Sequence, residues 1–290
     1  PSDGAGGTGK TCSIAHVTHF LSKDGFVIVM VPWIDRILKQ QQRKRPFEIL
    51  QSNSVPGRWD HTRDSAEWLK FFRTQNLATL NKLQLTVTKT YEFSTRETCA
   101  EGAPLMAIVE LGIARPTLSS DCIMALTVEL KKLATDGRCK VALVMDGINS
   151  MFTENSTYVR EDFDYYTKQK WSFIPADCFT VVQAYRGMLN NDWTNGVIVG
   201  SIDNIARKDK DRESYMPRYV LGEEGWNALD PFVPVPVPEY DDMELKSAIA
   251  YYASKHWIQK HEALTPDGVQ ELACLSGYNP MVLNRSCAAL

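Results

Sequence analysis

The stretch Gly4-Ala5-Gly6-Gly7-Thr8-Gly9-Lys10-Thr11 decides the fold class of this 290-residue chain. It has the full G-x-x-x-x-G-K-[ST] spacing of a phosphate-binding loop, or P-loop. Its glycines allow successive backbone N–H groups to turn inward around an anion. Lys10 would reach the β- and γ-phosphates of a nucleotide, and the Thr11 hydroxyl would ligate Mg²⁺. The alternative is a glycine-rich surface turn, but residues 11–17 predict a buried helix whose positive N-terminus faces the same anion.

The position of this loop in the chain is unusual. A P-loop normally joins a buried β-strand to a helix, but only Pro1, Ser2 and Asp3 precede Gly4 here. None of the three is typical of a strand. We therefore expect the first strand of the sheet, and a targeting segment before it, to lie outside this sequence.

The composition is that of a globular protein with a sizeable core, since 44% of the residues are hydrophobic and 23% are charged. The net charge of −3 gives no overall preference for nucleic acid, although a local basic patch remains compatible with it. No apolar run approaches the 18 residues of a membrane span, so no membrane association is expected. The seven cysteines include no C-x-x-C pair, which favours reduced thiols.

Three apolar runs predict the strands of a parallel sheet, at residues 26–31, 140–147 and 196–201. Each is rich in β-branched or aliphatic residues, as in strands that are buried on both faces. Helical spacing of apolar residues predicts the intervening helices, at residues 10–22, 65–83, 105–113, 119–133 and 177–189. Ser65 is the expected N-cap of the second of these helices. The pattern indicates an α/β fold with a parallel sheet flanked by helices.

A carboxylate at the end of the second predicted strand completes the candidate site. Asp146 follows residues 140–145, and ligands of open α/β sheets bind beyond the carboxyl ends of the strands. An acid at this place normally holds Mg²⁺ in P-loop proteins, although a lone Asp also forms turns. The third strand ends in the polar residues Ser201 to Asn204, where a γ-phosphate sensor would lie.

The residue after Asp146 argues against rapid hydrolysis. Hydrolytic P-loop proteins often carry Glu there to orient the attacking water, but this chain has Gly147. Asn149 and Glu154 are possible substitutes that no spacing argument favours. Four arginines are candidates for the cation that stabilises the transition state: Arg186, Arg207, Arg212 and Arg218. Because loss of these parts slows phosphoryl transfer by orders of magnitude, we expect nucleotide binding with slow or no hydrolysis.

The role of three further segments is left open by the sequence. Residues 36–64 are polar and basic, which indicates either a solvated loop or a segment that contacts an RNA backbone. Residues 85–91 alternate and predict an exposed strand or hairpin arm. Residues 151–176 look like an insertion in which aromatic and charged residues interleave, as if to stack on RNA, dock on a protein or pack on their own domain.

The C-terminal part differs in its sequence pattern, with a proline-rich stretch followed by helical segments. Residues 232–238 are Phe232 followed by alternating valine and proline, and they predict an extended connector, because proline cannot donate to a sheet ladder. Helices are expected at residues 242–258, 265–275 and 280 to the end, with Thr265 as a cap. We expect two domains, a nucleotide-binding α/β domain over residues 1–230 and a helical lid over residues 231–290.

With these residues in view, the chain resembles the death-associated protein three family of the mitochondrial ribosomal small subunit over nearly its whole length. The shared stretches are specific, and Met145-Asp146-Gly147-Ile148-Asn149 and Leu229-Asp230-Pro231-Phe232 are among them. Further matches are Gly9-Lys10-Thr11, His16-Val17-Thr18-His19-Phe20, Ser65-Ala66-Glu67-Trp68-Leu69-Lys70, Asn191-Asp192-Trp193, residues 221–228 and Asn279-Pro280.

The resemblance implies a P-loop fold related to signal-transduction ATPases and AAA+ proteins, with GTP or GDP and Mg²⁺ in the pocket. The sequence does not decide between guanine and adenine nucleotides, because no N-K-x-D guanine motif is present. By position it implies metal ligation by Thr11 and Asp146. The implied cofactor-binding residues are Gly4, Gly7, Thr8, Gly9, Lys10, Thr11, Cys12, Asn279 and Pro280. The last two belong to Gly277-Tyr278-Asn279-Pro280, which looks like a lid motif that packs near the base.

The same resemblance implies a mitochondrial matrix location in the head of the small ribosomal subunit. The implied partners are small-subunit rRNA, ribosomal proteins and, through an intersubunit bridge, the large subunit. An active switch GTPase or ATPase is the alternative function. The family has also been linked to apoptosis, on which the sequence is silent.

Overall fold

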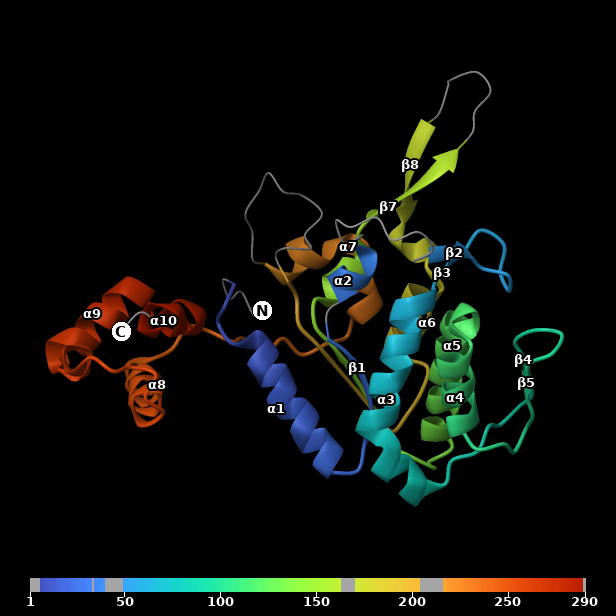
Figure 1. Ribbon diagram of the computed structural model, residues 1–290, viewed down its shortest axis with the longest axis horizontal. Coiled ribbons are helices and arrows are strands. Elements are labelled where there is room, and N and C mark those ends of the chain that lie inside the picture. Colours follow the sequence, from blue (N-terminus) through green and yellow to red (C-terminus); the bar gives the residue numbers. More distant parts are fainter. Residues whose placement is uncertain (1–5, 33, 40–48, 163–169, 204–215, 289–290) are drawn as a thin grey trace.

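The fold is built around a parallel sheet of three strands in the order β1-β6-β9 (Figure 1). The computed structural model describes residues 6–32, 34–39, 49–162, 170–203 and 216–288. The strands are β1 (Val27–Val31), β6 (Val141–Met145) and β9 (Gly196–Gly200). Their register pairs Val31 with Met145 and Met145 with Gly200, so all three strands end at one edge of the sheet. The three predicted strands and their parallel arrangement are confirmed.

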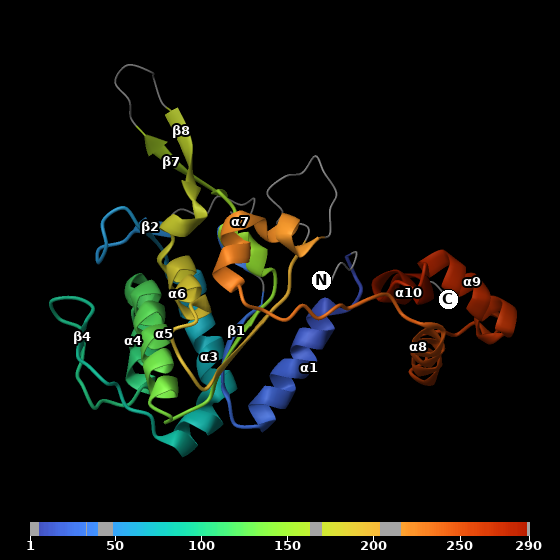
Figure 2. The same cartoon turned by 180° about the vertical axis from the view of Figure 1, so that it is seen from behind.

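Helices cover both faces of this sheet (Figure 2). Alternate residues of β1 and β6 point to opposite faces, so Val29 and Leu143 join one apolar cluster while Ile28 and Val144 join another. The first cluster packs against α3 (Thr62–Leu83), α4 (Met106–Ala114), α5 (Ser119–Thr135) and α6 (Thr180–Leu189). The second packs against α1 (Lys10–Lys23). These five helices confirm the predicted ones to within about three residues at each end.

Ser65 is not the N-cap that the sequence predicts. Helix α3 begins three residues earlier, and His61 occupies the N-cap position. Ser65 is buried inside the first turn, where its hydroxyl pairs with that of Ser120 on α5 at 3.0 Å. The local sequence favours a cap at Ser65, but packing of α3 on α5 moves the helix start.

The outer edge of β1 is closed by side chains of α3. The amide of buried Asn76 accepts a hydrogen bond from Ile28 N at 2.7 Å and donates one to Ile28 O at 2.9 Å. The indole of Trp68 donates to Met30 O at 2.8 Å. Asn76 therefore takes the place of a neighbouring strand, which satisfies backbone groups that an edge strand would otherwise leave open.

Strand β9 differs from the prediction that residues 196–201 are buried on both faces. Within the described residues β9 pairs with β6 alone, and its side chains alternate between exposed and half-buried. Ile198 is 37% exposed. The physical reason is its edge position. Val197 still packs against the α1-side cluster, whereas Ile198, which is in register with Leu143, lies on the opposite face.

The described parts of residues 36–64 contain regular structure rather than a solvated loop alone. They include most of α2 (Ile34–Leu38) and an antiparallel hairpin of β2 (Ile49–Gln51) and β3 (Trp59–His61). Most of the basic run at residues 39–45 lies outside the described residues.

Two further hairpins occur. Leu85 and Val87 are buried rather than exposed, ahead of the hairpin formed by β4 (Tyr91–Glu92) and β5 (Thr98–Cys99). The expected insertion contains β7 (Asn155–Asp162) and β8 (Lys170–Pro175), which extend away from the sheet (Figure 1). Its aromatic residues Phe163, Tyr165 and Tyr166 lie outside the described residues.

The C-terminal part is helical and has an apolar cluster of its own. Helix α7 (Pro217–Leu229), which the sequence does not predict, packs on the main cluster through Val220 and Leu221. An extended connector follows, as expected, and leads to α8 (Asp242–Ser254), α9 (Pro266–Ser276) and α10 (Pro280–Cys287). Leu245, Ile249, Leu272 and Leu283 form the centre of the separate C-terminal cluster.

Candidate phosphate-binding site

The glycine-rich loop enters helix α1 at the carboxyl edge of the sheet. Gly7 and Gly9 have φ angles of 92° and 106°, in the left-handed region that disfavours other residues. Gly9 is the N-cap of α1, and its carbonyl accepts from Ser13 N at 2.9 Å. Gly4, one of the expected binding residues, lies outside the described residues.

Thr8 supplies an unsatisfied polar group inside the loop. Its side chain is only 4% exposed, and Oγ1 has no hydrogen-bond partner among the described residues. Lys10 and Cys12 follow on the first turn of α1, where Lys10 is half-buried and the Cys12 thiol is exposed. A buried hydroxyl without a partner is costly, so Thr8 fits a site that receives a polar ligand.

The carboxylate of Asp146 connects the loop to the sheet. Thr11 Oγ1 on α1 donates a hydrogen bond of 2.8 Å to Asp146 Oδ2, although the two residues lie 135 positions apart. Ser201, which follows β9, donates its hydroxyl proton to Asp146 Oδ1 and accepts from Gly147 N at 3.3 Å. The parallel register brings these residues together at one edge, as predicted for Ser201; Asn204 lies outside the described residues.

The C-terminal helix α10 closes on the other side of the loop. Asn279 is the N-cap of α10, and its Nδ2 donates to Gly6 O at 3.1 Å. Met281 N donates to Gly7 O at 3.1 Å, while Pro280 occupies the first turn of the helix. The sequence pattern Asn-Pro signals a helix start. No side-chain pattern identifies Met281, because its hydrogen bond to the loop is made by its backbone N–H.

The backbone conformation at position 147 favours glycine. It is buried, with φ of 70° and ψ of 42°, so a side chain there would force an L-residue into the left-handed region. Of the possible substitutes for a water-orienting acid, Asn149 uses both ends of its amide on the backbone of Asp203. Glu154 is exposed at the start of the β7 hairpin region.

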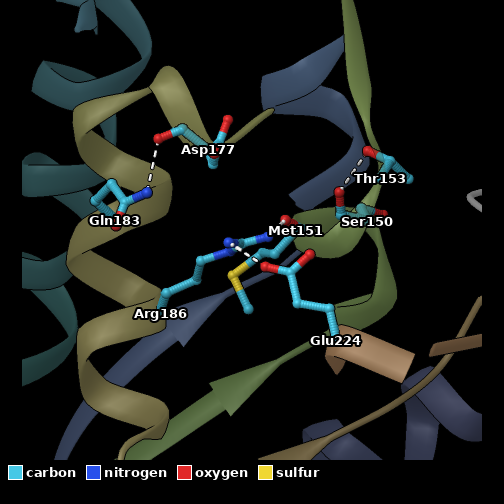
Figure 3. A network of polar contacts seen from close by, with 7 residues as sticks. All are labelled: Ser150, Met151, Thr153, Asp177, Gln183, Arg186 and Glu224. Atoms are coloured by element: carbon cyan, nitrogen blue, oxygen red, sulfur yellow. Dashed lines mark hydrogen bonds and ion pairs between the residues drawn. The ribbon is translucent and has the colours of Figure 1, made fainter. Parts of the chain in front are cut away.

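The arginine candidates divide into two groups. Arg186 on α6 points toward the segment after β6, where Nη1 donates to Glu224 at 2.8 Å and Nη2 to Met151 O (Figure 3). Its guanidinium also lies 4.8 Å from the ring centroid of Phe152. Arg218 is exposed, 6.0 Å from the Trp226 ring. Arg207 and Arg212 lie outside the described residues.

Among the described residues, no group of three or more His, Cys, Asp or Glu is arranged to hold a metal ion. A magnesium site does not need such a cluster, because Mg²⁺ is often held by one carboxylate, a hydroxyl and the phosphates of its nucleotide. Within the same part of the chain, no helix has the length and hydropathy to cross a bilayer.

These features define an α/β protein with a helix-flanked parallel sheet, a glycine-rich loop at its carboxyl edge and a C-terminal helical region. Residues 3–286 match the family described as mitochondrial ribosomal death-associated protein 3. The chain belongs to this family, which confirms the resemblance seen in the sequence and the assignment to the mitochondrial ribosome.

Two mammalian relatives cover almost the whole chain. It is 33% identical to the small ribosomal subunit protein mS29 of Mus musculus, over 99% of this chain and 69% of the mouse protein. It is 33% identical to the same protein of Bos taurus, over 99% of this chain and 68% of the bovine protein. The chain is therefore a homologue of mS29.

Proposed function

We propose that this chain is a structural component of the mitochondrial small ribosomal subunit that holds GTP or GDP with Mg²⁺ and hydrolyses it slowly or not at all. The first part rests on membership of the family and on the relatives, which are named small ribosomal subunit proteins. The second rests on the loop and the residues gathered around it.

The contact between Thr11 and Asp146 is the observation that carries the nucleotide proposal. A hydroxyl after the loop lysine and a carboxylate at the end of a parallel strand are the two protein groups that P-loop proteins use for Mg²⁺. Here they lie 2.8 Å apart at the edge where ligands of α/β sheets bind. A surface turn would give no reason for this pairing.

The residues of the loop fit the phosphates of a nucleotide. Gly7, Thr8, Gly9 and Lys10 would hold the phosphates through backbone N–H groups and the ammonium group, and buried Thr8 Oγ1 would gain a partner. Bound Mg²⁺ would supply neutralisation of phosphate charge, with Thr11 and Asp146 as its protein ligands. Cys12 lies on the same helix turn. ADP or ATP would satisfy these contacts equally well, so the preference for guanine rests on the family.

Three observations support slow hydrolysis. Gly147 offers no side chain to orient water, and Asn149 is engaged with Asp203. Arg186 is held by Glu224 and the Met151 carbonyl. Steady turnover well above background by the complete protein would contradict this part of the proposal.

We further propose a division into a P-loop domain over residues 1–230 and a helical lid over residues 231–290. The separate apolar cluster of α8 to α10 supports this division. In the ribosome, the proposed partners are small-subunit rRNA, neighbouring ribosomal proteins and, through a bridge in the head region, the large subunit.

A Lys10→Ala variant tests the structural role of the nucleotide, with exposed Lys23→Ala at the other end of α1 as a control. Nucleotide at about 100 times its dissociation constant stabilises a folded protein by about 2.7 kcal/mol. We therefore expect Lys10→Ala to lose nucleotide binding, melt lower than wild type in the presence of GDP and incorporate poorly into small subunits. Normal incorporation with an empty pocket would contradict the proposal.

A further inference from the structure

Helix α10 binds two carbonyl groups on the outside of the glycine-rich loop. The side chain of Asn279 donates to Gly6 O, and the backbone N–H of Met281 donates to Gly7 O, each at 3.1 Å. These contacts link residues near the two ends of the chain, 273 positions apart for Gly6 and Asn279. Carbonyl groups of a glycine-rich loop have little else to fix their direction, because glycine is conformationally free.

Fixing a carbonyl also fixes the N–H of the same peptide group. In a planar trans peptide the C=O and the following N–H point in opposite directions. The carbonyl of Gly6 shares its peptide plane with the N–H of Gly7, and the carbonyl of Gly7 shares its plane with the N–H of Thr8. When α10 holds both carbonyls outward, the N–H groups of Gly7 and Thr8 are aimed away from α10, toward the interior of the loop.

We propose that the N-terminus of α10 preorganises the phosphate cradle, with Asn279 as a positioning residue that acts through the loop rather than on the ligand. This inference rests on the proposed nucleotide-binding function. Aimed N–H groups need no reorientation when the anion arrives, and preorganisation of this kind raises affinity by lowering the cost of binding.

The packing between α10 and the loop supports the same role. A Cβ atom added at Gly7 would lie 2.6 Å from Met281 Cβ and 2.9 Å from Asn279 Oδ1. Gly7 is therefore required for the approach of α10 as well as for the φ angle of 92°. The other end of the Asn279 amide caps its own helix, since Oδ1 accepts from Met281 N at 3.1 Å and from Val282 N at 3.2 Å.

The contact has a reciprocal consequence. If α10 improves the affinity of the loop for phosphate, bound nucleotide must stabilise the docking of α10 by the same factor. The docking of the C-terminal helical region on the loop then depends on whether nucleotide is bound. Its position would depend on nucleotide without any hydrolysis.

Asn279→Ser separates the loop contact from the helix cap. Serine is also a good N-cap, so α10 keeps its start, but the donor to Gly6 O is lost. Thr265→Ala is the matched control. Thr265 is the N-cap of neighbouring α9, and its Oγ1 accepts from Gly268 N at 3.1 Å. The substitution removes this cap and leaves the contact between Asn279 and the loop intact.

Calorimetric titration of the full chain with GDP and Mg²⁺, and in parallel with ADP and Mg²⁺, measures the effect. We expect Asn279→Ser to weaken binding by about 3- to 10-fold, the worth of one hydrogen bond. Thr265→Ala should lower the melting temperature and leave affinity within about twofold. Wild-type affinity in Asn279→Ser would overturn the inference.

Hydrogen exchange supplies a second readout. Saturating nucleotide should slow exchange in peptides covering residues 279–287 in the wild type, and less so in Asn279→Ser. Nucleotide binding without any change in these peptides would overturn the inference and leave the proposed function standing. Failure of the wild type to bind either nucleotide would overturn both.

Discussion

At the scale of single residues, Asp146 carries most of the proposed chemistry. Its two oxygens accept from the hydroxyls of Thr11 and Ser201, so the carboxylate joins the helix after the loop to the ends of β6 and β9. Neutral hydroxyls satisfy its geometry but do not neutralise its charge, which leaves the position favourable for a divalent cation.

Asp146→Asn keeps one acceptor oxygen, places an NH2 donor at the other position and removes the charge. We expect nucleotide affinity in the wild type to fall when EDTA removes Mg²⁺, and affinity of the variant to be nearly the same with and without the ion. Titrations with GDP in Mg²⁺ and in EDTA measure the difference. An Mg²⁺ effect of equal size in both proteins would mean that Asp146 is not a ligand.

Asn76 is the residue on which the edge of the sheet depends. Asn76→Leu would leave the N–H and C=O of Ile28 buried without partners, at a cost of about 3 kcal/mol in the free energy of unfolding. Urea denaturation measures it. Asn81→Leu, at an exposed position of the same helix, is the control and should change stability by less than about 0.5 kcal/mol. Equal effects would show that Asn76 does not seal the edge.

At the scale of elements, the junction of β3 and α3 holds an unusual histidine. His61 is 1% exposed, stacks on Phe179 with ring centroids 4.6 Å apart, and has no partner for either ring nitrogen among the described residues. Burial lowers the pKa of His61 to about 3. The folded protein therefore keeps this ring neutral, while the unfolded chain protonates it near pH 6.5.

The sign of the pH effect follows from this difference. Above pH 6.5 neither state binds the proton, and below it only the unfolded state does, so stability falls as pH drops toward 3. Between pH 7.5 and pH 5, the wild type should lose about 2 kcal/mol relative to His61→Phe. Burial raises the pKa values of nearby Asp60 and Asp121, but both proteins share them. Denaturation at several pH values measures the stability of both proteins. If the wild type and His61→Phe lost equal stability as pH falls, buried neutral His61 would not be the cause.

The elements also show what the sequence could predict. Apolar periodicity places α1, α3, α4, α5 and α6 because their buried faces repeat at helical spacing. It misses α7, where Gly222 has φ of 69° and interrupts the helix. It also misjudges β9, because Gly-Val-Ile-Val-Gly looks the same whether or not a second neighbour covers its edge.

At the scale of the whole molecule, the described residues form an apolar core on the two faces of the sheet and a separate C-terminal cluster, and α10 hydrogen-bonds to the loop. The C-terminal cluster consists of side chains from α8, α9, α10 and the segment between α8 and α9. Thr11 and Asp146 could be placed in one site from the sequence, because loop and strand end are each recognisable motifs. The hydrogen bond from Met281 to Gly7 could not, because it joins backbone atoms of distant segments.

Leu283→Ala tests whether the C-terminal unit has its own stability. Leu283 is fully buried in the C-terminal cluster, and its truncation should cost that unit about 2–4 kcal/mol. Hydrogen exchange should then accelerate in α8, α9 and α10 and stay unchanged in β6. Acceleration throughout the chain would show that the two units unfold as one.

The most direct test of the central claim is a density map of the mitochondrial small ribosomal subunit that contains this chain. The account predicts density for a nucleotide over the loop from Gly6 to Cys12, with Mg²⁺ between its phosphates, Thr11 and Asp146. The same map identifies the base and the number of phosphates. A well-resolved loop with no nucleotide density would contradict the account.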